Sequence, residues 1–218
     1  MADDQEPGFD WRAFTPDDSP KTPMELHADP LHQALSTAEV RAGGPAHDFS
    51  SPIYDFSKGH KVITGRGFNL LEAAREKPVA LIFGSYTCPP FRAQLGALHE
   101  LWETWREKVS FVVVYIREAH PEEGWVVTPN RDEGILVNDP NSTDERVEVA
   151  AACAINLKIR IPVVVDEVDD EIARAYGALP DRLYLIGQDG TIAYQGEPGP
   201  FGFDPAGLEG AITGLVGG

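Results

Sequence analysis

The chain has 218 residues, 42% of them hydrophobic, which is enough for one globular domain with a full core plus an extension. Its formal net charge of −17 argues against nucleic acid and against an anionic membrane surface as partners. The N-terminus lacks the basic and apolar regions of a signal peptide, and no run approaches the ~18 apolar residues of a membrane span. Cys88 and Cys153 are the two cysteines, too few for a disulfide framework, so we expect a reducing cytoplasm.

Residues 1–43 are predicted to be an acidic extension. The first fifty residues contain ten acidic and three basic side chains, and residues 1–43 contain no strand-like run. Asp29 and Pro30 open an apolar stripe that ends before Gly43, which predicts one short helix over about 30–42. Two interpretations of this helix are open, packing on the domain or on a second subunit.

Residues 44–218 are predicted to form one domain of the α/β class. The predicted strands are 53–56, 61–64, 78–83, 109–116, 161–166, 182–186 and 191–194, with a turn at 57–59. The predicted helices are 91–108, 142–157, 172–176 and 205–216, and a polar insertion occupies about 117–141. This order predicts a central mixed sheet flanked by helices, with a hairpin at one edge.

Cys88 lies at the corner between the predicted strand 78–83 and the predicted helix 91–108. Pro89 and Pro90 suit the first turn of a helix, which places Cys88 at or next to the N-cap. Unpaired N–H groups and the helix dipole favour an anion there, so we expect a lowered thiol pKa and interpret Cys88 as a nucleophilic thiolate. The alternative is a small buried apolar residue, the usual fate of a free cysteine.

A collinear set of short motifs runs through residues 44–216. The motifs are Gly44-Pro45-Ala46-x-Asp48-Phe49, Gly84-Ser85-Tyr86-Thr87-Cys88-Pro89-Pro90-Phe91, Tyr115-Ile116-Arg117-Glu118-Ala119-His120, Gly124-Trp125, Pro162-Val163-Val164-Val165-Asp166, Arg182-Leu183-Tyr184 and Tyr194-Gln195-Gly196-x-x-Gly199-Pro200. The first resembles the opening of peroxiredoxin-like proteins. The others resemble the iodothyronine deiodinase family, with Cys88 where the vertebrate enzymes carry selenocysteine. The resemblance implies a thioredoxin-like fold.

The resemblance also implies an activity and a set of site residues. Cys88 would take the place of the selenolate that removes iodine, and the polar residues grouped around it would be Ser85, Thr87, Tyr115, Glu118 and His120. The expected substrate is a small iodinated aromatic, and the expected reductant is an external thiol or a thioredoxin-type protein, with no bound cofactor. Because dimers occur in the family, a homodimer is a further expectation.

The candidates for substrate binding are Pro162, Trp125, Phe91 and Arg182. By resemblance to thioredoxin-like folds, Pro162 would carry a cis bond that faces Cys88. Trp125 would either wall an aromatic substrate or anchor the long insertion. The chain departs from the family at two positions that grip the amino acid end of thyroid hormone. The family has a histidine where this chain has Pro140, and a basic residue where it has Pro198, or Glu197 if the match is shifted by one residue.

Alternation along the strand 109–116 bears on the polar candidates. Glu118 and His120 are two residues apart and would share one face. They would form a proton relay, since a histidine changes charge near neutral pH, or they would lie at a solvated strand end. Strict alternation puts Tyr115 on the opposite side, so a strand end must turn it if it is to reach Cys88. Ser85 would donate to the thiolate or cap the turn.

The chemistry of a sulfur nucleophile leaves three functional hypotheses. The first is reductive deiodination of an aromatic substrate, the second is reduction of peroxide or disulfide by the same cysteine, and the third is a thioredoxin-like binding module with an idle cysteine. Phe91, three residues after Cys88, excludes a Cys-x-x-Cys reductase. Cys153 would resolve an intermediate or pack structurally. The remaining histidines show no ligand spacing, so no metal site is predicted.

Overall fold

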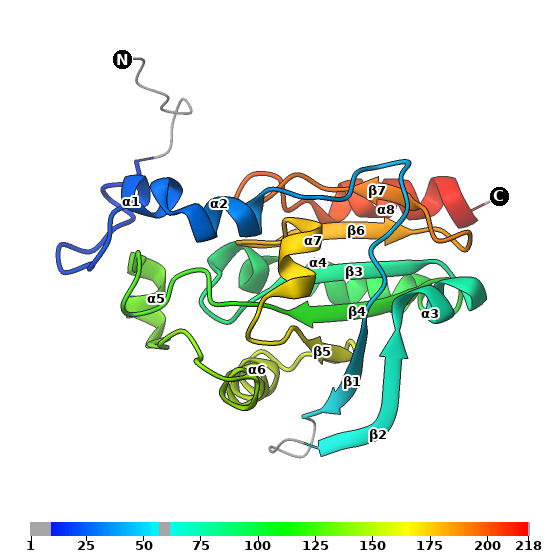
Figure 1. Ribbon diagram of the computed structural model, residues 1–218, viewed down its shortest axis with the longest axis horizontal. Helices are drawn as coiled ribbons and strands as arrows, with labels where there is room; N and C mark the ends of the chain where they lie inside the picture. The colour runs from blue at the N-terminus through cyan, green and yellow to red at the C-terminus, as the bar shows by residue number, and fades with distance from the viewer. Residues whose placement is uncertain (1–9, 57–61, 218) are drawn as a thin grey trace.

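The computed structural model describes residues 10–56 and 62–217, and is built on a seven-stranded sheet of order β2-β1-β5-β4-β3-β6-β7. In Figure 1, α7 crosses in front of the sheet while α4 and α8 lie behind it. The strands are β1 (Ser50–Asp55), β2 (Val62–Asn69), β3 (Val79–Gly84), β4 (Ser110–Tyr115), β5 (Val163–Val165), β6 (Arg182–Ile186) and β7 (Ile192–Gln195).

The centre of the sheet combines both strand directions. β3, β4 and β5 run parallel, whereas β6 pairs antiparallel with β3 and β7 with β6. Every residue of β3, β5 and β6 is buried, as expected for apolar strands that are covered on both faces. The predicted mixed sheet with an edge hairpin is therefore confirmed.

β1 and β2 extend the sheet on its other side. They pair antiparallel, and β1 meets β5 at Tyr54 and Val163. β2 continues to Asn69, five residues beyond the predicted strand 61–64. The turn predicted at 57–59 lies outside the described residues.

The helices follow the predicted pattern in most places. They are α3 (Leu70–Glu76), α4 (Pro89–Trp105), α5 (Thr128–Glu133), α6 (Thr143–Asn156), α7 (Glu171–Tyr176) and α8 (Pro205–Val216). The apolar stripe of α4 is buried at Phe91, Leu95, Leu98 and Leu101, while Trp102 and Trp105 are half-buried. Two of these six helices were not predicted, α3, which is a short helix capped by Asn69, and α5, which lies inside the insertion.

The N-terminal extension contains two helices, α1 (Pro23–Ala28) and α2 (Pro30–Ser36), so the prediction of a single helix over 30–42 was wrong. Thr22 and Glu25 form a capping box that begins α1, and Thr37 adopts an extended backbone that ends α2. Leu35 of α2 is fully buried, and its carbonyl accepts a hydrogen bond from the Leu179 N–H. The extension thus packs on its own chain. The boundary at residue 44 stays a prediction.

The cis proline next to the Cys88 strand is not the predicted one. The cis bonds precede Pro180 and Pro200, so the expectation for Pro162 was wrong. The reason is topological, because Pro162 opens β5, which is separated from β3 by β4, whereas Pro180 precedes β6, the antiparallel neighbour of β3.

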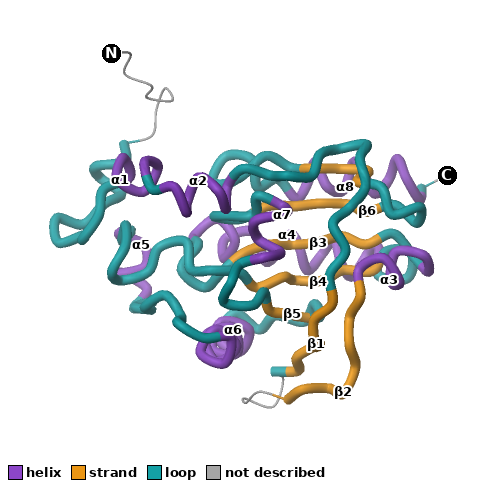
Figure 2. The backbone as a smooth tube through the Cα atoms, in the orientation of Figure 1, coloured by secondary structure: helices purple, strands orange, loops and turns teal. Residues whose placement is uncertain are grey.

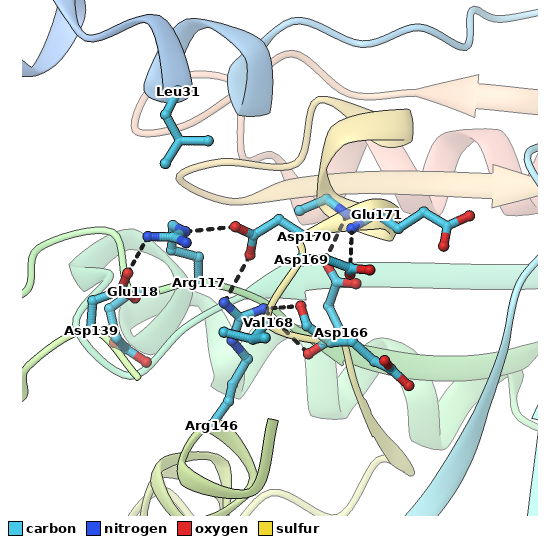
Figure 3. Close-up of polar contacts among 12 residues, drawn as sticks. Leu31, Arg117, Glu118, Asp139, Arg146, Asp166, Val168, Asp169, Asp170 and Glu171 are labelled. Atoms are coloured by element: carbon cyan, nitrogen blue, oxygen red, sulfur yellow. Dashed lines mark hydrogen bonds and ion pairs between the residues drawn. The ribbon is translucent and has the colours of Figure 1, made fainter. Parts of the chain in front are cut away.

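A buried ion network joins the insertion to α6 and α7 (Figure 3). The Arg146 guanidinium on α6 is completely buried and lies 2.8 Å from the carboxylate of Asp170. Arg117 contacts the same carboxylate through Nε at 2.8 Å and also pairs with Asp139. Arg146 donates two further hydrogen bonds to the carbonyls of Asp166 and Glu167. The network fixes the start of the insertion against the rest of the fold.

We predict that Arg146→Met lowers the free energy of unfolding by about 3 kcal/mol, because it removes one partner from a buried ion pair and leaves carbonyls unpaired. Urea unfolding followed by circular dichroism measures this. The control is Arg160→Met, which breaks the half-exposed pair with Glu103 and is expected to cost about 1 kcal/mol or less. Equal losses in the two variants would show that the network contributes no more than a surface pair.

Candidate active site

Cys88 is the N-cap residue of α4, directly after β3, as the two prolines predicted. Its backbone is extended, with φ −89° and ψ 106°, and its side chain is completely buried. The Sγ atom lies 3.2 Å from Oδ2 of Asp181 and donates a hydrogen bond to it. The sulfur therefore faces a carboxylate that sequence reasoning had not assigned to the site.

Asp181 stands between Pro180 and the first residue of β6. It is fully buried, and burial raises the pKa of its carboxyl to about 7, against the smaller opposing effect of the hydrogen bond from Cys88. Its second oxygen, Oδ1, has no hydrogen-bond partner among the described residues. No local sequence pattern assigns Asp181 to the site, because its place there depends on the pairing of β6 with β3.

The expected thiolate at Cys88 is contradicted. Burial raises the pKa of the Cys88 thiol well above its usual value, and the adjacent Asp181 charge raises it further. The N–H of Phe91 and the charge of Arg92 act in the opposite direction but do not prevail. The helix N-terminus is present, as predicted, yet desolvation and a buried acid outweigh it. The pKa shift of Cys88 is thus opposite in direction to the predicted one, and the thiol is hydrogen-bonded to Asp181.

Glu118 organises the other side of the Cys88 turn. Its Oε2 accepts hydrogen bonds from the Thr87 N–H at 2.9 Å and the Thr87 hydroxyl at 2.6 Å. Its Oε1 accepts from the Tyr115 hydroxyl, which in turn accepts from the Tyr86 N–H at 3.0 Å. Tyr115 reaches Glu118 because β4 ends at Tyr115, so strand alternation no longer applies. Burial raises the pKa of Glu118, opposed by the bonds from Thr87 and Tyr115.

His120 is held by the same turn. The backbone N–H of His120 donates to the Thr87 hydroxyl at 3.0 Å, and the ring Nδ1 lies 3.0 Å from the Trp125 carbonyl. A carbonyl only accepts, so Nδ1 carries the proton and Nε2 is left as an acceptor. Burial lowers the pKa of His120 to about 4, which corrects the expectation of a charge change near neutral pH. Among the described residues, no hydrogen bond joins His120 to Cys88.

The remaining candidates have structural contacts. Ser85 accepts a hydrogen bond from the Ala119 N–H at 3.1 Å, which neither sequence interpretation anticipated. Trp125 is nearly buried and donates from Nε1 to the Thr15 hydroxyl at 2.9 Å, which favours the anchoring interpretation. Phe91 is a core residue, packed so closely that a Cβ on Gly84 would lie 2.3 Å from its ring.

Arg182 uses its donors on the backbone. Its Nε donates to the carbonyl of Gly196 at 2.7 Å and its NH1 to that of Gly177 at 3.1 Å. Its role in substrate binding stays a prediction, as does that of Pro162. Cys153 is buried on α6, in accordance with a packing role. Within residues 10–56 and 62–217, no group of three or more His, Cys, Asp or Glu side chains is arranged to hold a metal ion.

Solved structures with the same arrangement define the class of fold. A putative thiol:disulfide interchange protein from Chlorobium tepidum is similar with a TM-score of 0.56 at 18% identity, over 81% of this chain and 99% of that one. A putative protein disulfide isomerase from Bacteroides thetaiotaomicron is similar with a TM-score of 0.53 at 18% identity, over 83% of this chain and 92% of that one. These likenesses establish a thioredoxin-like fold, as the sequence motifs implied.

Sequence relatives define the family. The model of the iodothyronine deiodinase family matches residues 37–212. The chain is 35% identical to thyroxine 5-deiodinase of Ovis aries, over 76% of this chain and 52% of that protein, and 34% identical to that of Homo sapiens, over 76% and 50%. It is 30% identical to the type I iodothyronine deiodinase of Xenopus laevis, over 80% and 59%. The chain belongs to the iodothyronine deiodinase family, and spans about half the length of these relatives.

Within residues 10–56 and 62–217, no helix is both long and apolar enough to cross a membrane.

We predict that Asp181→Asn raises the thermal midpoint, and that the gain grows as pH rises. The folded-state pKa of Asp181 is raised, so its stability contribution is fully present below the unfolded value and is lost as pH rises towards about 7. Asparagine does not titrate, so the midpoint gain should widen by roughly 4 °C between about pH 5 and about pH 8.

Asp189 provides the exposed control. Its carboxyl accepts hydrogen bonds from Thr191, which lower its pKa, so Asp189→Asn cannot produce a gain that grows with pH. A pH-independent difference between Asp181→Asn and the unaltered chain would show that Asp181 is ionised throughout this range.

Proposed function

We propose that this protein is a cysteine-dependent oxidoreductase that removes iodine reductively from an iodinated aromatic substrate, with Cys88 as the nucleophile. Family membership supports the reaction class. The observation that carries the proposal is the 3.2 Å hydrogen bond from Cys88 Sγ to Asp181 at the start of α4. A buried acid whose pKa is close to neutral suits the transfer of a proton from a thiol.

The first step couples the thiol proton to bond exchange. Cys88 gives its proton to Asp181 as the sulfur attacks iodine, the S–I bond forms and the C–I bond breaks. The electron pair of the C–I bond stays on carbon, which then takes the proton from Asp181. The sulfur is oxidised to the sulfenyl iodide and the carbon is reduced to C–H. Because the proton moves within the pair, the site does not need a resting thiolate.

The second half of the cycle uses an external thiol as reductant. One thiol attacks the sulfenyl iodide, which releases iodide and leaves a mixed disulfide on Cys88. A second thiol attacks this disulfide, restores the Cys88 thiol and leaves as the oxidised disulfide. We propose a small thiol or a thioredoxin-type protein in this role, with no cofactor bound by the chain.

The Glu118 network positions the nucleophile in this proposal. Thr87 precedes Cys88, and Glu118 fixes both its N–H and its hydroxyl, while Asn130 donates to its carbonyl at 2.8 Å. Held in this way, the turn aims Sγ at Asp181. His120 also holds the turn through its backbone N–H, which donates to the Thr87 hydroxyl, while its neutral ring stays bonded to the Trp125 carbonyl.

We propose iodinated aromatic compounds as the substrate class, without a requirement for the amino acid end of thyroid hormone. Pro140 and Pro198 leave no basic side chain at the two positions that grip the amino acid end of the hormone in the family. We therefore propose recognition of the iodinated ring itself.

A substrate panel tests the proposal. Purified protein and dithiothreitol are supplied with an iodothyronine, iodotyrosine, iodophenol or hydrogen peroxide, and iodide release or peroxide loss is measured. We expect thiol-dependent iodide release from at least one aromatic and a loss of about 100-fold or more in Cys88→Ser, since the reaction requires the nucleophile.

Cys153→Ser is the matched control, and we expect it to retain activity because Cys153 is a buried packing residue. Peroxide consumption without iodide release would replace the proposal by a thiol peroxidase. Inactivity towards all four compounds, with both cysteines unreactive, would instead favour a binding module.

A further inference from the structure

We propose that residues 10–21, the N-terminal strap, close the Cys88 site, and that Trp11 determines which reagents reach the sulfur. The strap precedes the residues matched by the deiodinase family, which begin at 37. The inference concerns access to Cys88, and so it holds for any electrophile that the cysteine attacks.

The need for an opening follows from burial. Cys88 and Asp181 are both completely buried, so a substrate cannot touch Sγ in the observed conformation. Reaction with any external reagent therefore requires a segment to move, and the reaction rate depends on the population of the open form.

Two loops flank the Cys88 turn. The insertion contacts it through Asn130, which donates to the Thr87 carbonyl, and through the His120 N–H, which donates to the Thr87 hydroxyl. Residues 196–203, in the connection between β7 and α8, contact Asp181, since the Gly199 N–H donates to the Asp181 carbonyl at 3.2 Å. Figure 2 shows the insertion and the N-terminal segment together at the end of the sheet near α5.

Trp11 bridges these two loops with its ring. Its centroid lies 5.3 Å from that of Trp125 in the insertion and 6.5 Å from that of Phe201 in the connection, with an edge-to-face arrangement in both pairs. Trp125 in turn packs against His120, with centroids 4.7 Å apart. The ring of Trp11 thus joins the two segments that contact the Cys88 turn and Asp181.

The strap is bonded to the insertion along its length. The hydrogen bonds are Thr128 N–H to the Phe14 carbonyl at 2.9 Å, Trp125 Nε1–H to the Thr15 hydroxyl at 2.9 Å, Val126 N–H to the Ser19 hydroxyl at 2.9 Å and Lys21 N–H to the Gly124 carbonyl at 3.1 Å. On the other side, Phe201 is 60% exposed. We place the opening between Trp11 and this exposed residue, so that the strap and the insertion move together.

Two thiol reagents of different size test the strap. Methyl methanethiosulfonate is small, whereas 5,5′-dithiobis(2-nitrobenzoate) is a bulky aromatic disulfide, and peptide mapping assigns each modification to Cys88 or Cys153. In Trp11→Ala we expect the bulky reagent to modify Cys88 about tenfold faster, because two aromatic contacts are lost. The small reagent, which needs a narrower opening, should gain about threefold or less.

The control variant is Trp102→Ala, on α4, where the ring packs beneath the guanidinium groups of Arg106 and Arg160. It should leave both rates unchanged. Phe201→Ala removes the exposed ring on the opposite side of the opening and should reproduce the selective gain even if Trp11→Ala fails to fold. Unchanged rates in both variants would overturn the proposal. Equal acceleration of the two reagents would also overturn it, since that result indicates general loosening of the fold.

Discussion

The hydrogen bond between Cys88 and Asp181 is the interaction on which the account of this site depends. It joins the residue that begins α4 to the residue that precedes β6, so the antiparallel pairing of β6 with β3 sets its geometry. Both side chains are buried, which raises the pKa values of the thiol and of the carboxyl. A proton shared between two such groups can leave the sulfur without creating a charge that must be solvated. This replaces the common arrangement, in which a helix N-terminus alone stabilises a thiolate.

Two sets of contacts hold the residues around the Cys88–Asp181 hydrogen bond in place. Glu118 gathers the donors of Thr87 and Tyr115 and so fixes the turn that carries the cysteine. Behind it, Arg117 and Arg146 hold the insertion against α6 and α7, and the Glu118 N–H donates to Asp139 of the same network at 3.3 Å. The charges of Arg117 and Arg146 are paired with Asp139 and Asp170, as their burial requires. The site is therefore rigid at its base and closed at its outer side by the strap.

Much of the fold followed from local patterns, because strands covered on both faces are continuously apolar and helices show their stripe and caps. β3, α4 and β4 were predicted within a few residues. The motif around Cys88 located the turn, and the family resemblance, rather than their spacing, placed Glu118 and His120 beside it. Asp181 was missed because its role arises from the pairing of β6 with β3, about ninety residues apart in sequence, which no local pattern reports. The pKa of Cys88 was predicted with the wrong sign for the same reason, since burial and Asp181 are both tertiary features.

The dependence of Cys88 alkylation on pH tests the central claim most directly. Iodoacetamide is applied across a pH series to the unaltered chain and to Asp181→Asn, and modification of the Cys88 peptide is followed with the Cys153 peptide as internal reference. The account predicts that the rate in the unaltered chain rises as Asp181 ionises near pH 7. In Asp181→Asn the rate should stay low until much higher pH, since the thiol must then lose its proton unaided. Superimposable profiles for the two proteins would contradict the account, because they would show that Asp181 has no part in activating the sulfur.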